Sequence, residues 1–508
     1  MLVKYIKKIL EATVYDVACE TPIQKMDSMS RMLGNTVWVK REDLQPVHSF
    51  KLRGAYNKIS KLSSIERKRG VVAASAGNHA QGVAMAADKL GVKATIFMPV
   101  TTPLIKVEAV KAFGGKYVHV ELFGDCFDVA NAHAQDFAKK HSAVLIPPYD
   151  DPDVIAGQGT VGMEILRQCS GPLDAIFVPV GGGGLIAGIA AYVKYLRPEI
   201  KIIGVEANDS ACLQAALKKG RRVELEKTGN FADGVAVAQI GREPFEIAKA
   251  YVDDVVTVSS DEICAAIKDL FEDTRSITEP AGALSLAGLK KMAVSRRWKN
   301  KVLVNIASGA NVNFDRLRYV SERYGVGQKT EAILAVTVPE KPGALMALCD
   351  LLKTHNITEF NYRNSAESSA NVFVAIQVPG GIKERKSVLQ LLRKEKYSVV
   401  DMSENELAKM HVCHMVGGVA SRSFDERLFS FEFPERAGIL REFLGVLRGR
   451  WNISLFHYRC HGGTYAHVLV GLQTLSKKDK YKLADFLKEL NYPWVDETEN
   501  PAYAMFLK

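Results

Sequence analysis

The sequence has no closely spaced pairs of cysteines. Its eight cysteines are scattered over 508 residues, and no two of them stand in a CxxC pattern. Disulfide frameworks and zinc sites use short, regular spacings. The histidines and cysteines of the C-terminal half repeat no zinc spacing either: His411, Cys413, His414, His457, Cys460 and His461. We therefore expect no metal, and reduced thiols as in a cytoplasmic protein.

Long apolar segments are also missing. The uncharged stretch at 175–193 contains five glycines and Pro179, which divide it into a strand, a glycine-rich turn and a helix. A membrane-spanning helix needs about 20 predominantly apolar residues. Lysines interrupt the N-terminal segment, so no signal peptide is expected. These absences predict a chain with no membrane partner.

The charges form no concentrated patch. The net charge is +10, from 67 basic and 57 acidic residues, and both signs are spread along the chain. Binding of nucleic acid favours basic residues gathered on one face, so we expect no nucleic acid partner. A mild basic excess suits small anions such as phosphates and carboxylates.

The chain does contain enough apolar sequence for several cores. Hydrophobic residues make up 47% and charged residues 24%, as in ordinary globular proteins. At roughly 150 residues per domain, the length suggests about three units. From 71 to 307, β-branched runs alternate with amphipathic helical stretches, and the predicted strands are 71–74, 94–98, 175–180, 202–205 and 302–306. This alternation predicts a doubly wound α/β domain whose ligands bind at the carboxyl ends of the strands.

The C-terminal part contains a repeat. Residues 333–363 and 429–459 each read as a strand, a Pro-Glu turn with a glycine (Gly343 or Gly438), an amphipathic helix, and a second strand ending in Tyr-Arg. This similarity predicts a duplicated βαβ module. Gly325–Thr330 is the expected hinge in front of it.

Lys51 is the first candidate for chemistry, because the segment Ser49–Ala55 places its amine among small and apolar neighbours. An amine held against an apolar wall loses its proton near neutral pH and can attack a carbonyl. Pyridoxal phosphate is the usual carbonyl. The alternative interpretation is an exposed lysine after a turn.

A first loop suited to anions joins a predicted strand to a helix. Its backbone N–H groups, together with the helix dipole, suit a carboxylate or phosphate. The loop consists of Ser75, Ala76, Gly77, Asn78 and His79. The amide of Asn78 can also reach a phenolic oxygen, although a plain helix N-cap is the alternative.

A second loop contains four glycines in a row, which provide no side chains for packing. Its backbone must therefore approach a ligand closely, and a phosphate is the ligand that suits such a loop. It consists of Gly181, Gly182, Gly183, Gly184 and Leu185. The pattern Gly182-x-Gly184-x-x-Ala187 also fits the dinucleotide fingerprint, with Glu206 where a ribose-binding acid is expected. An NAD-dependent oxidoreductase is therefore a competing hypothesis, although it gives Lys51 no role.

Ser308 follows the last predicted strand and so should reach the same rim. Opposite a pyridine nitrogen, a hydroxyl donates a hydrogen bond without protonating the ring, which favours prompt β-elimination. The alternative is a simple Ser-Gly turn. Glu279-Pro280 is read as the start of a helix, with a first-turn acid and an N1 proline.

These four motifs, in this order, resemble those of the fold-type II pyridoxal-phosphate enzymes, which are tryptophan synthase β-like. With the double tail, the chain resembles the biosynthetic threonine dehydratases, whose tails are two α+β ACT-like regulatory modules. The resemblance implies a catalytic domain at 1–325 and modules at 332–404 and 427–498. It implies Lys51 as the Schiff-base lysine, Asn78 at the ring hydroxyl of pyridoxal 5'-phosphate, Gly181 to Leu185 around its phosphate, and Ser308 at its ring nitrogen.

The same resemblance implies an activity. L-Threonine would be dehydrated and deaminated to 2-oxobutanoate and ammonia, the committed step of isoleucine biosynthesis, with L-serine as a second possible substrate. Lys51 would take the α-proton while the Ser75–His79 amides hold the substrate carboxylate. Isoleucine would inhibit, valine would oppose it, and the enzyme would be a homotetramer. Besides the NAD-dependent oxidoreductase, the competing hypotheses are a serine-specific eliminating enzyme, a racemase and a non-enzymatic amino-acid sensor.

Overall fold

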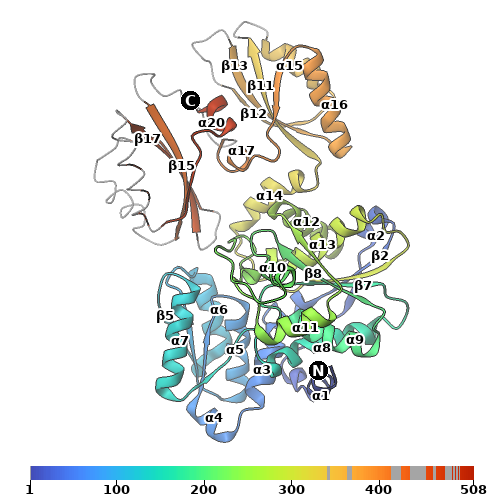
Figure 1. The fold of residues 1–508 in the computed structure, drawn as a ribbon, viewed down its shortest axis with the longest axis vertical. Helices are drawn as coiled ribbons and strands as arrows, with labels where there is room; N and C mark the ends of the chain where they lie inside the picture. Colours follow the sequence, from blue (N-terminus) through green and yellow to red (C-terminus); the bar gives the residue numbers. More distant parts are fainter. Residues whose placement is uncertain are drawn as a thin grey trace. The chain divides into compact units, whose positions relative to one another are not determined.

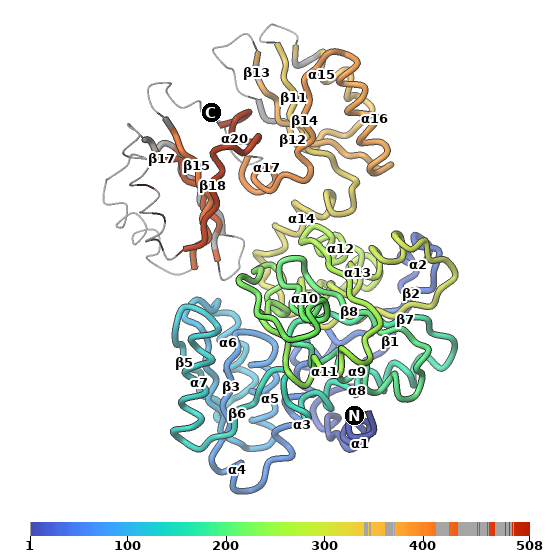
Figure 2. Tube along the Cα trace, in the orientation of Figure 1, coloured from blue at the N-terminus to red at the C-terminus, as the bar shows by residue number. Residues whose placement is uncertain are grey.

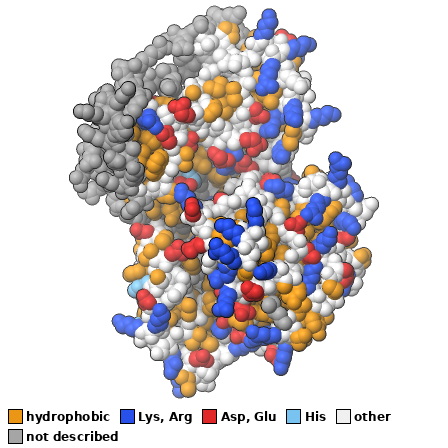
Figure 3. All heavy atoms as spheres, in the orientation of Figure 1, with side chains coloured by type: hydrophobic (Ala, Val, Ile, Leu, Met, Phe, Trp, Pro, Cys, Tyr) orange, Lys and Arg blue, Asp and Glu red, His pale blue; other side chains and the backbone are white. Residues whose placement is uncertain are grey.

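The computed structural model divides into two compact units, Met1–Arg316 and Leu317–Lys508. It describes residues 2–339, 344–362, 369–412, 425–434, 453–460, 465–474, 483, 487, 490 and 492–507. Figure 1 shows the order of the elements from blue to red. Basic and acidic side chains both occur on the face drawn in Figure 3. No helix in the described ranges is long and apolar enough to cross a membrane.

Unit 1 contains a six-stranded sheet. Its strands, in spatial order, are β1 (Ile23–Lys25), β2 (Thr36–Lys40), β10 (Val302–Ile306), β7 (Ala175–Pro179), β8 (Lys201–Ala207) and β9 (Asp254–Val258). All neighbouring pairs are parallel except β1 and β2. The interior strands are almost fully buried, as the continuous apolar runs predict.

A second, four-stranded parallel sheet lies in the same unit. Its order is β5 (Val118–Leu122), β4 (Ala94–Met98), β3 (Val71–Ala74) and β6 (Val144–Leu145). Figure 2 shows β3, β5 and β6 among α5, α6 and α7. All five predicted strands exist, and they are divided between two sheets, a division that the prediction of a doubly wound α/β domain did not specify. An apolar run shows that a strand is buried, and it does not show which strand lies beside it.

Helices surround both sheets of unit 1. Gly91, with φ of 64°, ends α5, since glycine adopts this left-handed conformation without a steric penalty. The helices are α1 (Leu2–Leu10), α2 (Asp27–Leu33), α3 (Lys51–Ser60), α4 (Ser64–Arg69), α5 (Asn78–Leu90), α6 (Leu104–Gly114), α7 (Phe127–His141), α8 (Pro152–Gln168), α9 (Gly184–Leu196), α10 (Cys212–Lys219), α11 (Arg242–Tyr251), α12 (Ser260–Thr274) and α13 (Pro280–Ser295). The next helix, α14 (Arg316–Gly327), starts at the last residue of unit 1 and otherwise belongs to unit 2. Four 3-10 turns complete unit 1: η1 (Val14–Asp16), η2 (Glu42–Leu44), η3 (Gly115–Tyr117) and η4 (Asp233–Val235).

Unit 2 contains two four-stranded antiparallel sheets with the same strand order, β12-β13-β11-β14 and β16-β17-β15-β18. Both carry a register shift at the equivalent place, between Ile357 and Glu359 and between Ile453 and Leu455. The elements are β11 (Glu331–Pro339), α15 (Ala344–Leu352), β12 (Ile357–Tyr362), β13 (Ser369–Gln377), α16 (Gly381–Lys394), β14 (Ser398–Asp401), α17 (Glu406–Met410), β15 (Asp425–Pro434), β16 (Ile453–Cys460), β17 (Tyr465–Thr474), β18 (Trp494–Asp496) and α20 (Pro501–Phe506).

The repeat is therefore larger than the predicted βαβ module. In the first copy, β13, α16 and β14 follow β12, and β13 pairs with both β11 and β12. The predicted hinge also differs, since Gly325–Gly327 form the last turn of α14. The Gly325 carbonyl accepts the N–H of Thr330, which satisfies one of the carbonyl groups at that helix end. Gly343, Gly438, Cys413, His414 and His461 lie outside the described residues.

Candidate active site

The segments singled out in the sequence meet in unit 1. Lys51 opens α3, Asn78 opens α5 after β3, and Ser308 follows β10. Ser49 and Gly309 form an antiparallel bridge, and the Phe50 N–H donates to the Ser308 carbonyl at 3.3 Å. The Lys51 and Ser308 segments, 257 residues apart in sequence, are therefore in direct contact.

Lys51 is half-buried in the structure, not a fully exposed lysine. Its Nζ donates to the Pro148 carbonyl at 3.0 Å and lies 5.4 Å from the centroid of the Phe50 ring. Burial lowers the pKa of Lys51 to about 8, against the opposing effect of the Glu279 carboxylate. A substantial fraction of this amine is therefore neutral at mildly alkaline pH, as a nucleophile or base requires.

The loop after β3 keeps only part of its backbone free for a ligand. The Ser75 N–H donates to the Phe97 carbonyl at 3.1 Å, and the Gly77 N–H donates to Ser75 Oγ at 3.2 Å. The N–H groups of Asn78 and His79 belong to the first turn of α5, where helix geometry offers no acceptor. A Cβ added at Gly77 would meet nothing within 4 Å, so there is open space over this loop.

The His79 side chain is buried beneath the loop. Its Nε2 lies 2.8 Å from the Ile146 carbonyl, which can only accept, so Nε2 carries the proton. Burial, together with the charge of Lys51, lowers the pKa of His79 to about 3, so the ring is neutral. Among the described residues, no partner reaches the acceptor Nδ1. Ser49 Oγ is a second buried polar atom without a described partner.

The glycine loop follows β7 and leads into α9. Gly183 has φ of 90°, and a Cβ at Gly182 would stand 2.1 Å from the Tyr149 ring, so both positions require glycine. The N–H groups of Gly184 and Leu185 lie in the first turn of α9 and have no acceptor within the helix. N–H groups at a helix start suit an anion such as phosphate.

The structure contradicts the role of Glu206 as the ribose-binding acid of a dinucleotide site. Both carboxylate oxygens of Glu206 accept backbone N–H groups at the start of α10, from Leu213 at 2.7 Å and from Gln214 at 2.8 Å. The side chain is completely buried. Glu206 therefore caps a helix and is not presented to a ribose.

Ser308 is buried, and its Oγ donates to the Ala281 carbonyl at 3.3 Å. This contact orients the hydroxyl at the junction of β10 and α13. At 3.3 Å the bond is long for an O–H donor, so a closer acceptor at the site would compete for the proton.

Glu279 has a position that its sequence context did not indicate. It does precede α13 with Pro280 at N1, as predicted, but its carboxylate does not cap that helix. Glu279 Oε1 instead accepts from Asn78 Nδ2 at 2.6 Å, and Asn78 Oδ1 accepts from Asn311 Nδ2 at 2.7 Å. The Asn78 amide is thus fixed from both ends, and only the tertiary contact between the residue before α13 and the first residue of α5 reveals this.

The environment of Glu279 is unusual for a carboxyl group. Burial and the nearby carboxylate of Asp233 raise the pKa of Glu279 to about 7. Asp233 itself pairs with Lys106 Nζ at 2.8 Å, which lowers the pKa of Asp233 and keeps it ionised. Glu279 is therefore poised to exchange a proton near neutral pH.

Glu279→Gln is expected to flatten the pH dependence of stability. The folded pKa of about 7 exceeds the ordinary 4.5, so the folded state holds a proton that the unfolded state has lost. The free energy of unfolding of the apo-protein should fall by about 2 kcal/mol from pH 5.5 to pH 7 through this one group. Urea unfolding at both pH values checks this. Parallel pH profiles for the two proteins would contradict the assignment.

The donor set fits a molecule that carries a carbonyl, an aromatic ring nitrogen and a phosphate. It comprises a desolvated amine, the oriented Ser308 hydroxyl, and the free N–H groups at the start of α9, together with the unpartnered Ser49 Oγ. Pyridoxal phosphate has all three features.

Comparison with known proteins supports this fit. Residues 14–309 match the family described as pyridoxal-phosphate dependent enzymes, and residues 322–412 and 417–507 each match the C-terminal regulatory domain of threonine dehydratase. The chain is 52% identical over 505 residues to the biosynthetic L-threonine dehydratase IlvA of Pasteurella multocida, covering 99% of this chain and 97% of that one.

Solved structures align with roughly two thirds of the chain. The processed form of threonine deaminase isoform 2 from Solanum lycopersicum aligns with a TM-score of 0.62 at 48% identity, over 64% of this chain and 93% of that one. Maize serine racemase aligns with a TM-score of 0.58 at 33% identity, over 62% of this chain and 96% of that one. From the paired regulatory domains and the near full-length identity, the chain belongs to the biosynthetic threonine dehydratase family of pyridoxal-phosphate dependent enzymes.

Proposed function

We propose that this chain dehydrates and deaminates L-threonine to 2-oxobutanoate and ammonia. The observation that carries the proposal is the desolvated amine of Lys51, held at 3.0 Å from the Pro148 carbonyl where the candidate segments meet. The tail supports the regulated, biosynthetic form of the activity, since its two copies share one strand order. The proposed domains are 1–325, 332–404 and 427–498.

The residues at the junction have separate roles toward the cofactor. Bound pyridoxal phosphate would supply a carbonyl for Lys51 and a ring that acidifies the α-carbon of an amino acid. Gly181 to Leu185 would hold its phosphate, Ser308 would face its ring nitrogen, and Asn78 would face its ring hydroxyl. The contact from Glu279 to Asn78 supports that last role, because it orients the amide.

The residues that act on the substrate follow from the same geometry. The N–H groups of Asn78 and His79 at the start of α5 bind the substrate carboxylate, and neutral His79 adds no charge there. The Lys51 amine takes the α-proton, which requires the neutral form that burial favours. A hydroxyl at Ser308 leaves the ring nitrogen unprotonated, which favours loss of the β-hydroxyl over racemisation.

The proposal extends to regulation and assembly. The two modules of unit 2 bind isoleucine as an inhibitor and valine as its antagonist, and the active form is a homotetramer. An effector can act only if its affinity differs between two states of the enzyme. The scattered free cysteines, including Cys19 and Cys126, support a cytoplasmic location.

An assay of 2-oxobutanoate released from L-threonine, with and without isoleucine, tests the proposal directly. Turnover of L-serine and formation of D-serine are measured in parallel, because the likeness to maize serine racemase favours racemisation as the second candidate. Release of 2-oxobutanoate that isoleucine suppresses supports the proposal. Formation of D-serine without release of 2-oxobutanoate would refute the proposal in favour of racemisation.

A further inference from the structure

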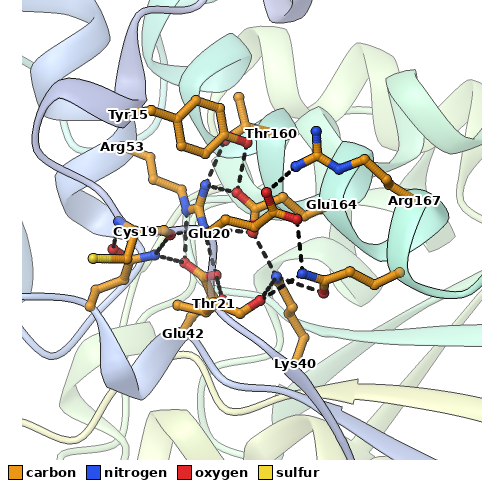
Figure 4. Close-up of polar contacts among 12 residues, drawn as sticks. Tyr15, Cys19, Glu20, Thr21, Lys40, Glu42, Arg53, Thr160, Glu164 and Arg167 are labelled. Atoms are coloured by element: carbon orange, nitrogen blue, oxygen red, sulfur yellow. Dashed lines mark hydrogen bonds and ion pairs between the residues drawn. The ribbon is translucent and has the colours of Figure 1, made fainter.

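Two residues after Lys51, a group of charged side chains is completely buried. We call it the Arg53 cluster, and it consists of Lys40, Glu42, Arg53 and Glu164, each with 0% of its surface exposed. Figure 4 shows these side chains pointing toward one another from separate elements. They come from β2, η2, α3 and α8.

Arg53 contacts both acids at once. Its Nε and Nη2 donate to the two oxygens of Glu42, each at 2.8 Å. Its Nη1 and Nη2 donate to the two oxygens of Glu164, at 2.5 and 2.9 Å. Nη1 also donates to Thr160 Oγ1 at 3.0 Å, and Nη2 to the Cys19 carbonyl at 3.2 Å. Only the planar guanidinium can make this double fork.

The remaining groups complete the cluster. Lys40 Nζ donates to Glu164 at 2.6 Å and to the Thr21 carbonyl at 2.5 Å. The Tyr15 hydroxyl donates to Glu164 at 2.8 Å, and the Thr21 hydroxyl donates to Glu42 at 2.6 Å. Two cations therefore balance two carboxylates.

Stability alone does not account for such a cluster. The cost of removing four charges from water is of the same order as their mutual attraction, and apolar side chains of similar volume often stabilise as well or better. Unlike apolar packing, the cluster fixes the orientation of the elements that it joins, because each hydrogen bond specifies an angle as well as a distance.

The orientation of the first turn of α3 matters because Lys51 is its first residue. No side chain caps α3, and its start is held from neighbouring backbones instead. A Cβ at Gly82 of α5 would meet Leu52 N at 3.0 Å, and a Cβ at Gly157 of α8 would meet the Arg53 carbonyl at 2.6 Å. The Phe50 N–H is bonded to Ser308 on the other side of Lys51.

We propose that the Arg53 cluster positions Lys51, by locking the first turn of α3 to β2, η2 and α8 so that the amine stays against the Pro148 carbonyl. Arg53 is thus a positioning residue with no contact to the substrate. Its importance for turnover rests on the proposed function of Lys51. The cluster carries no net charge, so its effect on the amine is through geometry.

Arg53→Lys tests the proposal, because lysine keeps the charge and loses the fork. Thr160→Val is the milder variant, since it removes one acceptor of Arg53 without altering charge. Lys58→Gln is the matched control, because Lys58 Nζ pairs with Asp151 at 2.7 Å and so joins the far end of α3 to the residue that precedes α8.

The first readout needs no cofactor. Competitive acetylation of the apo-protein, followed by peptide mass spectrometry, reports the pH midpoint of labelling at Lys51 itself. We expect a midpoint near 8 for the parent chain and for Lys58→Gln. In Arg53→Lys the midpoint should rise toward the ordinary lysine value of about 10.4, because a displaced amine regains water. Thr160→Val should lie between them.

The second readout is the holoenzyme. In Arg53→Lys, kcat per folded protein should fall on the order of 100-fold with little change in KM, and the visible circular dichroism of the bound cofactor should change. The proposal would be overturned if folded Arg53→Lys kept the kcat and the Lys51 acetylation midpoint of the parent chain. It would also be overturned if Lys58→Gln lost as much kcat as Arg53→Lys. If Arg53→Lys does not fold, Thr160→Val decides by the same criteria. A parent chain without threonine turnover would refute the proposed function, and the acetylation midpoints would still decide the positioning role.

Discussion

Lys51→Ala is expected to abolish release of 2-oxobutanoate from threonine, with a loss of at least ~10³-fold, and to leave no cofactor covalently attached after borohydride reduction. Lys51 is the amine at the junction of the Asn78 and Ser308 segments, and its lowered pKa makes it available as a nucleophile and base. Mass spectrometry of the reduced protein and a lactate dehydrogenase-type assay of the oxo acid measure the two effects.

Lys58→Ala is the control for this prediction. Lys58 lies on the same helix, and its amine pairs with Asp151. That variant should keep both the covalent attachment and the turnover. If Lys51→Ala retained normal turnover, or if the reduced cofactor were found on another lysine, the role of Lys51 would be refuted.

The second large effect is expected from removal of the two sheets of unit 2. A chain that ends after Gly327 keeps α14 and every candidate site residue, from Lys51 to Ser308. It should dehydrate threonine without any response to isoleucine, whereas the full chain should be inhibited. The match to the pyridoxal-phosphate dependent enzymes ends at residue 309 and the first regulatory match begins at 322, so the cut falls near the boundary between them.

Initial rates over a range of threonine concentrations, with and without isoleucine, measure the change. A circular dichroism melt of the shortened chain verifies that unit 1 is folded. Retention of sigmoidal inhibition by the folded, shortened chain would place the effector site in unit 1 and refute the regulatory role of unit 2. Loss of inhibition together with retained turnover supports it.

Local sequence signals predicted the parts of the fold that depend on neighbouring residues. All five predicted strands of unit 1 are present, and the repeated strand order confirms the duplication in unit 2. Alternating apolar patterns and glycine-rich turns act over a few residues, so they can be read from a short window. The same window could not show that the strands form two sheets, because strand pairing joins segments such as Thr36–Lys40 and Val302–Ile306.

The candidate site also contains residues that the sequence identified and residues that it did not. Lys51, Asn78, the glycine loop and Ser308 could be proposed from residue type and from their places after strands. Glu279 resembled an ordinary first-turn acid, and its contact with Asn78 spans 201 residues. Arg53 lay inside the Lys51 motif, but its partner Glu164 is 111 residues away.

By itself, the sequence determined five strands of unit 1, the duplication of the tail, and which residue types could serve a carbonyl cofactor with a phosphate. Only the tertiary structure decided that Glu206 caps a helix, that Glu279 holds Asn78, and that a neutral ionic cluster lies beneath Lys51. The physical reason is that burial and pairing set the pKa and the orientation of a charged group, and both arise from segments that meet only when the chain folds.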